Sequence, residues 1–151
     1  MTKRLKSWLP LLAWMCLIFA ASTDNGSAAH TAGFIVPMLR WLLPHASPTR
    51  IDSLHFLIRK AGHITEYAIL GILALRAFTP ENFRFSGKKR WRVAGLALAV
   101  AALYAAGDEF HQRFVPSRGA SLDDVLLDTF GAFFGIAALM FTRKRHDKNE
   151  S

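Results

Sequence analysis

Several features that define common protein classes are missing from this 151-residue chain. It has one cysteine, Cys16, which can form no disulfide within the chain and builds no cysteine metal site by itself. No glycine-rich phosphate loop and no internal repeat occurs. Acidic residues are scarce, 11 Asp and Glu against 19 Lys and Arg, and none precedes Asp24. These absences exclude a disulfide-stapled domain, a cysteine metal centre and a P-loop nucleotide site.

Apolar sequence, in contrast, is abundant. Hydrophobic residues make up 52% of the chain and the mean hydropathy is +0.20, yet the formal net charge is +8. Apolar blocks alternate with basic clusters, which is typical of a small polytopic membrane protein rather than of a soluble domain with one core. We therefore predict an all-α membrane protein, a small bundle of about four transmembrane helices with a short interfacial helix.

Four apolar segments are candidate spans within a single domain that covers residues 1–151. The segments are residues 7–23, 61–78, 93–112 and 122–142, with an outer segment at 24–60, a cytoplasmic loop at 79–92 and a cytoplasmic tail at 143–151. As helices, the uncharged cores of the last three would be only roughly 13–23 Å long, shorter than the ~30 Å hydrocarbon layer. These helices must therefore carry polar side chains into the bilayer at one end.

The first apolar segment has two interpretations. It is uncharged from Ser7 to Thr23 and follows Lys3, Arg4 and Lys6. This pattern fits a retained span, and it also fits a signal peptide that is cut at the small residues of "FAAST" or "GSAAH". We favour retention, and in both cases the following chain starts on the far side of the membrane.

The basic residues indicate the orientation of the four spans. With both termini in the cytoplasm, thirteen of the 19 Lys and Arg residues fall in inner segments and six in outer ones. Short inner loops rich in Lys and Arg are the positive-inside pattern. We therefore expect cytoplasmic N- and C-termini.

The outer segment contains a second kind of helix. The stretch "TAGFIVPMLRWLLPH" has a broad apolar face but is too short to span, and we expect Pro37 and Pro44 to break it. It is interpreted as an interfacial or re-entrant helix. After it, apolar residues at helical spacing predict one long helix from about Arg50 to Phe78, with Thr49 as its N-cap.

The predicted topology brings three polar clusters to the outer end of the bundle. They begin the second span, end the third and begin the fourth, at Arg59–Glu66, Asp108–Gln112 and Asp123–Asp128. Two interpretations stay open, an interhelical network that stabilises the bundle and a polar pocket that binds a ligand. Asp123 and Asp124 also have a purely local explanation, since Ser121 and Asp124 form a capping box and acids favour the first helical turn.

Asp128 is harder to explain as part of a cap. It lies about 9 Å into the fourth helix and shares a face with Asp124, Gly131 and Gly135. A stripe of small residues lets another helix approach closely, so Asp128 should face a packed interface, where a charge needs a partner. Arg118 is the best candidate to neutralise either Asp128 or the anion of a ligand, and we favour the ligand.

We favour the pocket because so many unlike polar groups exceed what packing requires. Arginine side chains match phosphate and carboxylate groups, and Lys60, Arg113 and Arg118 would suit an anion. The candidate ligand-binding residues are Lys60, His63, Glu66, Tyr67, Asp108, Glu109, His111, Gln112, Arg118, Asp124 and Asp128. The histidine–glutamate spacings also suit metal ligands, but such spacings are common by chance, so we expect neither a metal nor a cofactor.

At these residues the chain resembles a known family. The segments "RKAGHITEYAILGIL" and "DEFHQRFVPSRGASLDDVLLDTFGAFFG", with an acid-free first segment that ends in "IFAAST", are similar to the VanZ-like family of small bacterial membrane proteins, named for a teicoplanin-resistance protein. The resemblance runs from Trp8 to Gly135. Its pattern maps onto His63, Tyr67, Asp108, Glu109, His111, Gln112, Pro116, Arg118, Asp124, Asp128, Gly131 and Gly135. One departure is Arg59 before Lys60, where many relatives have aspartate, and this departure makes the site more basic.

The resemblance implies a place in the bacterial cell envelope but no particular reaction. We expect an inner-membrane protein whose outer pocket binds the anionic headgroup of a membrane lipid, a cell-wall precursor or a glycopeptide-like ligand, affecting antibiotic susceptibility, and no nucleic-acid partner. The alternative is a membrane-embedded hydrolase or transferase for a lipid-linked phosphate or ester, with Glu109 or His111 as base and Arg118 as charge stabiliser. We favour binding, because neither Ser117 nor Ser121 has an adjacent activating base.

Overall fold

The structure is a computed structural model that describes residues 3–79 and 87–149. Over these residues the chain contains five α-helices, one 3₁₀ turn and no strand, so the all-α prediction is confirmed. The elements are α1 (Lys3–Ala21), η1 (Asp24–Gly26), α2 (Ala28–Leu42), α3 (Pro48–Phe78), α4 (Gly87–Gln112) and α5 (Leu122–Asn149). Half of the expected cytoplasmic loop, residues 80–86 of 79–92, lies outside the described part of the chain, as do residues 1–2 and 150–151 at the termini.

The ends of the long helices follow local sequence signals. α3 is one continuous helix, as expected, but its N-cap is Ser47 and not Thr49. The Arg50 backbone N–H donates to Ser47 Oγ over 3.3 Å. Pro48 takes the first helical position, where the N–H that proline lacks would have no helical acceptor. α4 ends at Gln112 and α5 begins at Leu122, the residues at which the third span is predicted to end and the fourth to begin.

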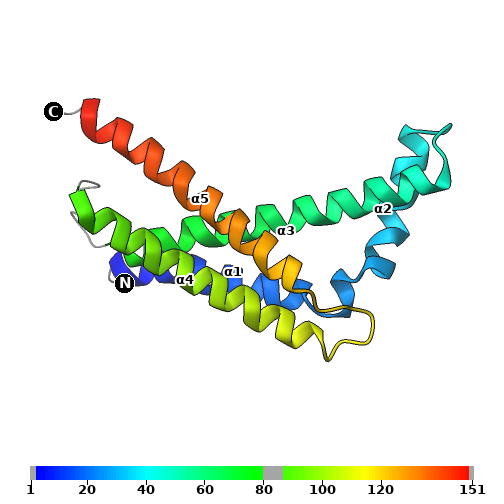
Figure 1. Cartoon of the computed structure of the whole chain (residues 1–151), viewed down its shortest axis with the longest axis horizontal. Helices are drawn as coiled ribbons and strands as arrows, with labels where there is room; N and C mark the ends of the chain where they lie inside the picture. The colour runs from blue at the N-terminus through cyan, green and yellow to red at the C-terminus, as the bar shows by residue number, and fades with distance from the viewer. Residues whose placement is uncertain (1–2, 80–86, 150–151) are drawn as a thin grey trace.

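The outer segment forms α2 and the first half of α3. α2 continues through Pro37, so the expected break at that residue is wrong, and the helix ends at Leu42 before Pro44. A proline inside a helix is costly, but α2 packs on α3 and buries Leu39, and this tertiary packing offsets the cost. The α2–α3 end of the molecule projects beyond the other helices (Figure 1).

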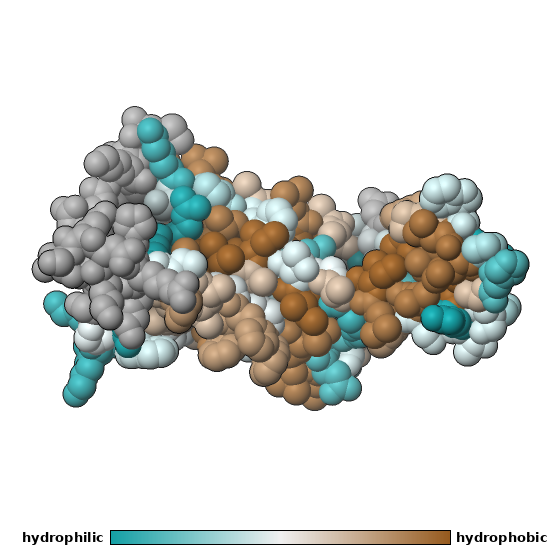
Figure 2. All heavy atoms as spheres, turned by 90° about the horizontal axis from the view of Figure 1, so that it is seen from above, coloured by the Kyte–Doolittle hydropathy of each residue, from teal (hydrophilic) through white to brown (hydrophobic). Residues whose placement is uncertain are grey.

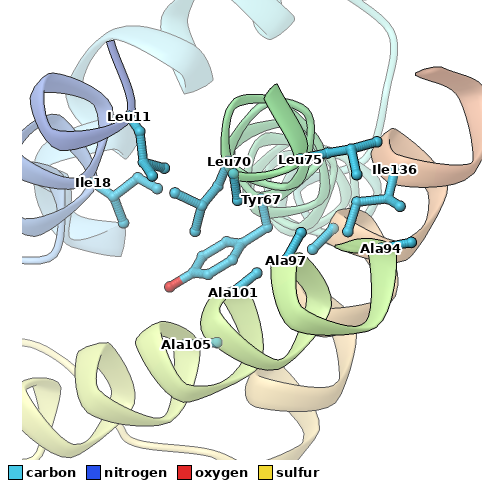
Figure 3. Close-up of a cluster of buried hydrophobic side chains, with 12 residues drawn as sticks. Leu11, Ile18, Tyr67, Leu70, Leu75, Ala94, Ala97, Ala101, Ala105 and Ile136 are labelled. Atoms are coloured by element: carbon cyan, nitrogen blue, oxygen red, sulfur yellow. The ribbon is translucent and has the colours of Figure 1, made fainter. Parts of the chain in front are cut away.

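The apolar core lies where α1, α3 and α4 meet. Figure 3 shows Tyr67 and Leu70 of α3 between α1 and α4, with Leu11 and Ile18 on one side. On the other side α4 presents buried alanines at spacings of three and four residues, namely Ala94, Ala97, Ala101 and Ala105. Small side chains on this face allow α4 to pack close to α3.

α3 and α5 cross in direct backbone contact (Figure 1). A Cβ atom added to Gly131 would lie 2.5 Å from the Ile64 carbonyl oxygen, and one added to Gly71 would lie 2.5 Å from the Ala132 carbonyl oxygen. Gly135 meets the α3 backbone in the same way. The predicted stripe of small residues on α5, which includes Gly131 and Gly135, is therefore confirmed as a contact between α5 and α3.

Within the described residues, two helices are long and apolar enough to cross a membrane. They are α4 and residues Leu122–Arg143 of α5, while Leu5–Ala21 of α1 forms a shorter apolar helix. α3 is not one of these two candidate helices. Figure 2 shows apolar side chains over much of one face, including the α2–α3 end, and hydrophilic ones toward both extremes.

Candidate functional site

A polar cavity opens where the end of α1, the η1 turn, α2 and α3 meet the loop at 113–121. Its volume is about 320 Å³. The residues that line it are Ala21, Ser22, Gly26, Thr31, Ile35, Ile58, Arg59, Gly62, His63, Glu66 and Arg118. We call this the outer cavity, after the predicted orientation. Its charged lining groups are two arginines and one glutamate, beside one histidine, so the lining has an excess of positive charge.

The guanidinium groups of both arginines lie close to Gly26. Arg59 Nη1 donates to the Gly26 carbonyl and to Thr31 Oγ1, both over 2.9 Å. Arg118 Nη2 donates to the carbonyl oxygens of Ala21 and Thr23, the latter over 3.3 Å. A Cβ atom at Gly26 would collide with Arg118 Nη2 and with the Ala21 backbone carbonyl, so this position requires a residue without a side chain.

The electrostatics of this pair favour an anion. Burial lowers the pKa of Arg118, and the nearby Arg59 lowers that pKa further, while Asp108, Glu109 and Glu66 act in the opposite direction. Burial also lowers the pKa of Arg59. Both guanidinium groups nevertheless stay protonated near neutral pH. Two half-buried cations in one cavity repel each other, and an anion bound between them would relieve that repulsion.

Arg118 does not pair with Asp128, which is the less favoured of the two alternatives for this arginine. The carbonyl groups at the end of a helix have no N–H donor within the helix and attract cations, which explains why Arg118 turns to the end of α1. Asp128 is fully buried, and its Oδ1 lies 3.4 Å from His63 Nδ1. This ion-pair contact does not have hydrogen-bond geometry, and neither Asp128 oxygen has a donor among the described residues.

α3 and α5 are joined by two charge contacts one turn apart. Lys60 Nζ contacts Asp124 Oδ1, and His63 contacts Asp128. The Lys60 ammonium also lies 5.3 Å from the centre of the Phe56 ring. Asp124 thus supplies the acidic neighbour that Lys60 lacks at the preceding position of its own helix.

Asp108 connects the end of α4 to the end of α1. Ser22 Oγ donates to Asp108 Oδ2 over 2.6 Å, and Gln112 Nε2 donates to the same oxygen over 3.0 Å. All three side chains are buried. This cluster helps to hold α1 beside α4 at the outer cavity.

Glu109 caps the start of α5. Its Oε2 accepts the Ser121 backbone N–H over 2.9 Å, while Ser121 Oγ accepts the Asp123 N–H over 3.1 Å. The predicted capping box is therefore only half correct. The serine acts as expected, but the carboxylate comes from Glu109 on α4, because Asp124 is engaged by Lys60.

The predicted site residues divide into those that line the outer cavity and those that lie outside its lining. His63, Glu66 and Arg118 line it. Those outside the lining are Lys60, Tyr67, Asp108, Glu109, His111, Gln112, Asp124 and Asp128. Tyr67 is fully buried in the apolar core, and the His111 ring packs on Phe19 with 4.6 Å between ring centres.

The sequence does not identify the other eight lining residues as part of the site, and Arg59, Ser22 and Gly26 are the most informative of them. Arg59 begins one of the predicted polar clusters and departs from the family pattern, but it is not among the predicted ligand-binding residues, although it places a second guanidinium in the cavity. Ser22 and Gly26 lie in small-residue stretches that also resemble signal-peptidase sites. No further feature of the sequence indicates that these two residues line a cavity. Within the described parts of the chain, no three His, Cys, Asp or Glu side chains are grouped closely enough to hold a metal ion.

Comparison with known proteins identifies the family. The family model described as VanZ/LLP1 matches residues 7–143, which include most of α1, most of α5 and every element between them. No curated protein and no solved structure matches the chain. The match covers nearly the whole sequence, so the chain belongs to the VanZ/LLP1 family.

Proposed function

We propose that this VanZ/LLP1 protein crosses the bacterial inner membrane four times and binds an anionic amphiphile in the outer cavity. The spans would be α1, the second half of α3, α4 and α5, with both termini in the cytoplasm. The ligand would be a membrane lipid or a lipid-linked cell-wall precursor. By binding it, the protein would alter the susceptibility of the envelope to glycopeptides such as teicoplanin.

One observation supports this proposal above the others, the pair of guanidinium groups in the outer cavity. Arg59 and Arg118 come from segments almost 60 positions apart and meet at Gly26. Each uses only part of its guanidinium for backbone and side-chain oxygens, and Arg118 Nε has no acceptor among the described residues. Arginine presents five N–H donors, so donors remain for a phosphate or carboxylate oxygen.

The apolar part of the lining supports an amphiphile rather than a free anion. Ile35 of α2 and Ile58 of α3 belong to the cavity, and neighbouring side chains such as Phe34 and Leu57 are exposed on the same two helices. A lipid headgroup could therefore bind the arginines while its chains lie against α2 and α3. Exposed apolar helices of this kind are typical of membrane contact.

The same geometry favours binding over catalysis. Glu109, a candidate base, lines a different cavity together with Arg113 and Ser121. Its carboxylate accepts the N–H that starts α5, which is a structural role. A base and a charge stabiliser must converge on one reacting group, and Glu109 and Arg118 line separate cavities.

The test is to fill the outer cavity and measure what co-purifies. Gly62 lines the cavity, and a Cβ atom added there would have no neighbour within 4 Å, so Gly62→Leu should fit without displacing the backbone. Gly107→Leu is the matched control, because Gly107 also has open space but lies outside the lining. Lipids that co-purify in detergent are then identified and counted by native mass spectrometry.

We expect an anionic lipid or lipid-linked phosphate on the wild type and on Gly107→Leu. We expect at least about a tenfold loss on Gly62→Leu, because the new side chain occupies the space of the headgroup and prevents its charge-assisted hydrogen bonds to the arginines. Equal ligand on all three proteins would refute the proposal. Conversion of an added lipid phosphate over time, lost in Glu109→Gln, would instead support the enzyme alternative.

A further inference from the structure

A second cavity lies between α4 and α5, toward the start of α4 and the far end of α5. These are the helix ends opposite the outer cavity, because α4 and α5 run in opposite directions (Figure 1). The volume is about 440 Å³. Its lining residues are Arg90, Trp91, Ala94, Gly95, Leu98, Phe133, Ile136, Ala137, Met140 and Phe141. Among the described residues of this lining, Arg90 is the one that carries a charge, and we call the cavity the inner groove.

The inner groove has the form of an apolar trough. Ala94 and Ile136 are buried and form its floor, while Phe133 is exposed beside it. Gly95 contributes no side chain, and a Cβ atom there would have no neighbour within 4 Å. The absence of a side chain at Gly95 therefore keeps part of the trough open, which suits a flexible hydrocarbon chain.

Arg90 supplies a polar end to the trough. Its guanidinium lies 5.1 Å from the centre of the Trp91 ring, and its buried Nε has no acceptor among the described residues. Lys88, Lys89 and Arg92 lie in the same helical turn. Arginine donates well-aligned hydrogen bonds to phosphate oxygens, and tryptophan and basic residues are enriched at the membrane interface.

We propose that the inner groove binds an anionic phospholipid, with an acyl chain in the trough and the phosphate on Arg90. The apolar lining with one cation at its end matches the two parts of such a lipid. A second copy of the chain is a poorer match. A symmetric contact through this groove would bring the basic cluster of each copy against that of its partner, and like charges repel.

The experiment titrates the detergent-purified full chain with phosphatidylglycerol and follows binding by native mass spectrometry. We expect Arg90→Gln to weaken binding about tenfold, the loss typical of a charge-assisted contact. Gly95→Leu should weaken it at least as much, because the new side chain fills the trough while Arg90 remains. Measuring both in the Gly62→Leu background removes any contribution from the outer cavity.

Two controls separate the groove from the surface charge and from the mere addition of a leucine to α4. Lys89→Gln removes a neighbouring exposed cation outside the lining, and Gly107→Leu adds a leucine to α4 elsewhere. Both should bind like the wild type. Thermal unfolding identifies any variant that does not fold, and Arg90→Lys, which keeps the charge but loses the planar guanidinium, should then show a weakening of a few-fold.

Three results would overturn the proposal. Binding that Gly95→Leu leaves unchanged would mean that phosphatidylglycerol is attracted only by surface charge. Equal losses of phosphatidylglycerol binding in Lys89→Gln and Arg90→Gln would also mean that the lipid is attracted only by surface charge. A dimer that Gly95→Leu dissociates, with phosphatidylglycerol binding unaffected, would assign the groove to a second copy of the chain.

Discussion

At the residue scale, the partners of Arg118 and Asp128 explain much of the charged stretch between α4 and α5. Arg118 holds the end of α1 through backbone oxygens, and Asp128 contacts His63 on α3. The two residues share no contact. Their charges therefore belong to different parts of the outer end, one at the cavity and one at the helix crossing.

The mutations Arg118→Gln and Asp128→Asn should consequently have independent effects on stability. We expect Arg118→Gln to lower the free energy of unfolding by about 1.5–3 kcal/mol, the range for hydrogen bonds that involve a charged group. The double variant should equal the sum of the single variants to within about 0.5 kcal/mol. Thermal and denaturant unfolding in detergent provide the measurement. A double variant that recovers most of the Arg118→Gln loss would show a direct charge pair and contradict the observed contacts.

At the element scale, the crossing of α3 and α5 depends on glycines that leave no room for a side chain. Gly131→Ala should force Ile64 and its backbone to move, and we expect a loss of about 1–3 kcal/mol, as for other overpacked sites. Gly107→Ala is the matched control in an open helical position, where alanine should be neutral or stabilising by up to about 1 kcal/mol. Equal melting temperatures for the two variants would contradict the close crossing.

α1 is integrated into the bundle by contacts along its whole length. Trp14 Nε1 donates to the Glu66 carbonyl over 2.9 Å, and Tyr104 Oη donates to the Met15 carbonyl over 2.5 Å. Leu11 and Ile18 are buried in the core. We therefore expect the purified protein to retain this helix, which intact-mass measurement can establish. A mature N-terminus near Asn25 or Ala29 would mean that α1 is removed and that the core forms without Leu11 and Ile18.

The elements themselves are largely predictable, because their signals are local. Apolar runs, Ser121 and the glycine stripe predict where α5 begins and which face it packs, and the structure agrees. The continuation of α2 through Pro37 is not predictable, since it depends on packing against α3. The cost of a proline inside α2 is outweighed by the packing of α2 on α3.

The partners of the polar side chains are much less predictable. Arg59 and Lys60 are adjacent, yet about 100° of helical rotation separates them, so Arg59 faces the outer cavity and Lys60 faces Asp124. No pattern in the sequence alone distinguishes these directions. The same holds for Glu109, whose partner at Ser121 depends on the path of the loop between α4 and α5.

At the scale of the whole molecule, the proposed topology places the polar cavity and the basic ends of the helices on opposite sides of the membrane. A reporter that is active only in the cytoplasm should work when fused after Ser151 and fail when fused after Arg118. The reason is the excess of Lys and Arg in the proposed inner segments. Activity of the Arg118 fusion would reverse the orientation, and with it the leaflet that faces each cavity.

The central claim is that Arg59 and Arg118 together bind an anionic headgroup in the outer cavity. The most direct measurement is an experimental structure of the purified protein in lipid nanodiscs made from bacterial lipids. We expect density for a headgroup within hydrogen-bonding distance of both guanidinium groups, with apolar chains beside Ile35 and Ile58. A cavity closed by its own side chains, with both arginines bonded only to protein and lipid headgroups bound elsewhere, would contradict it.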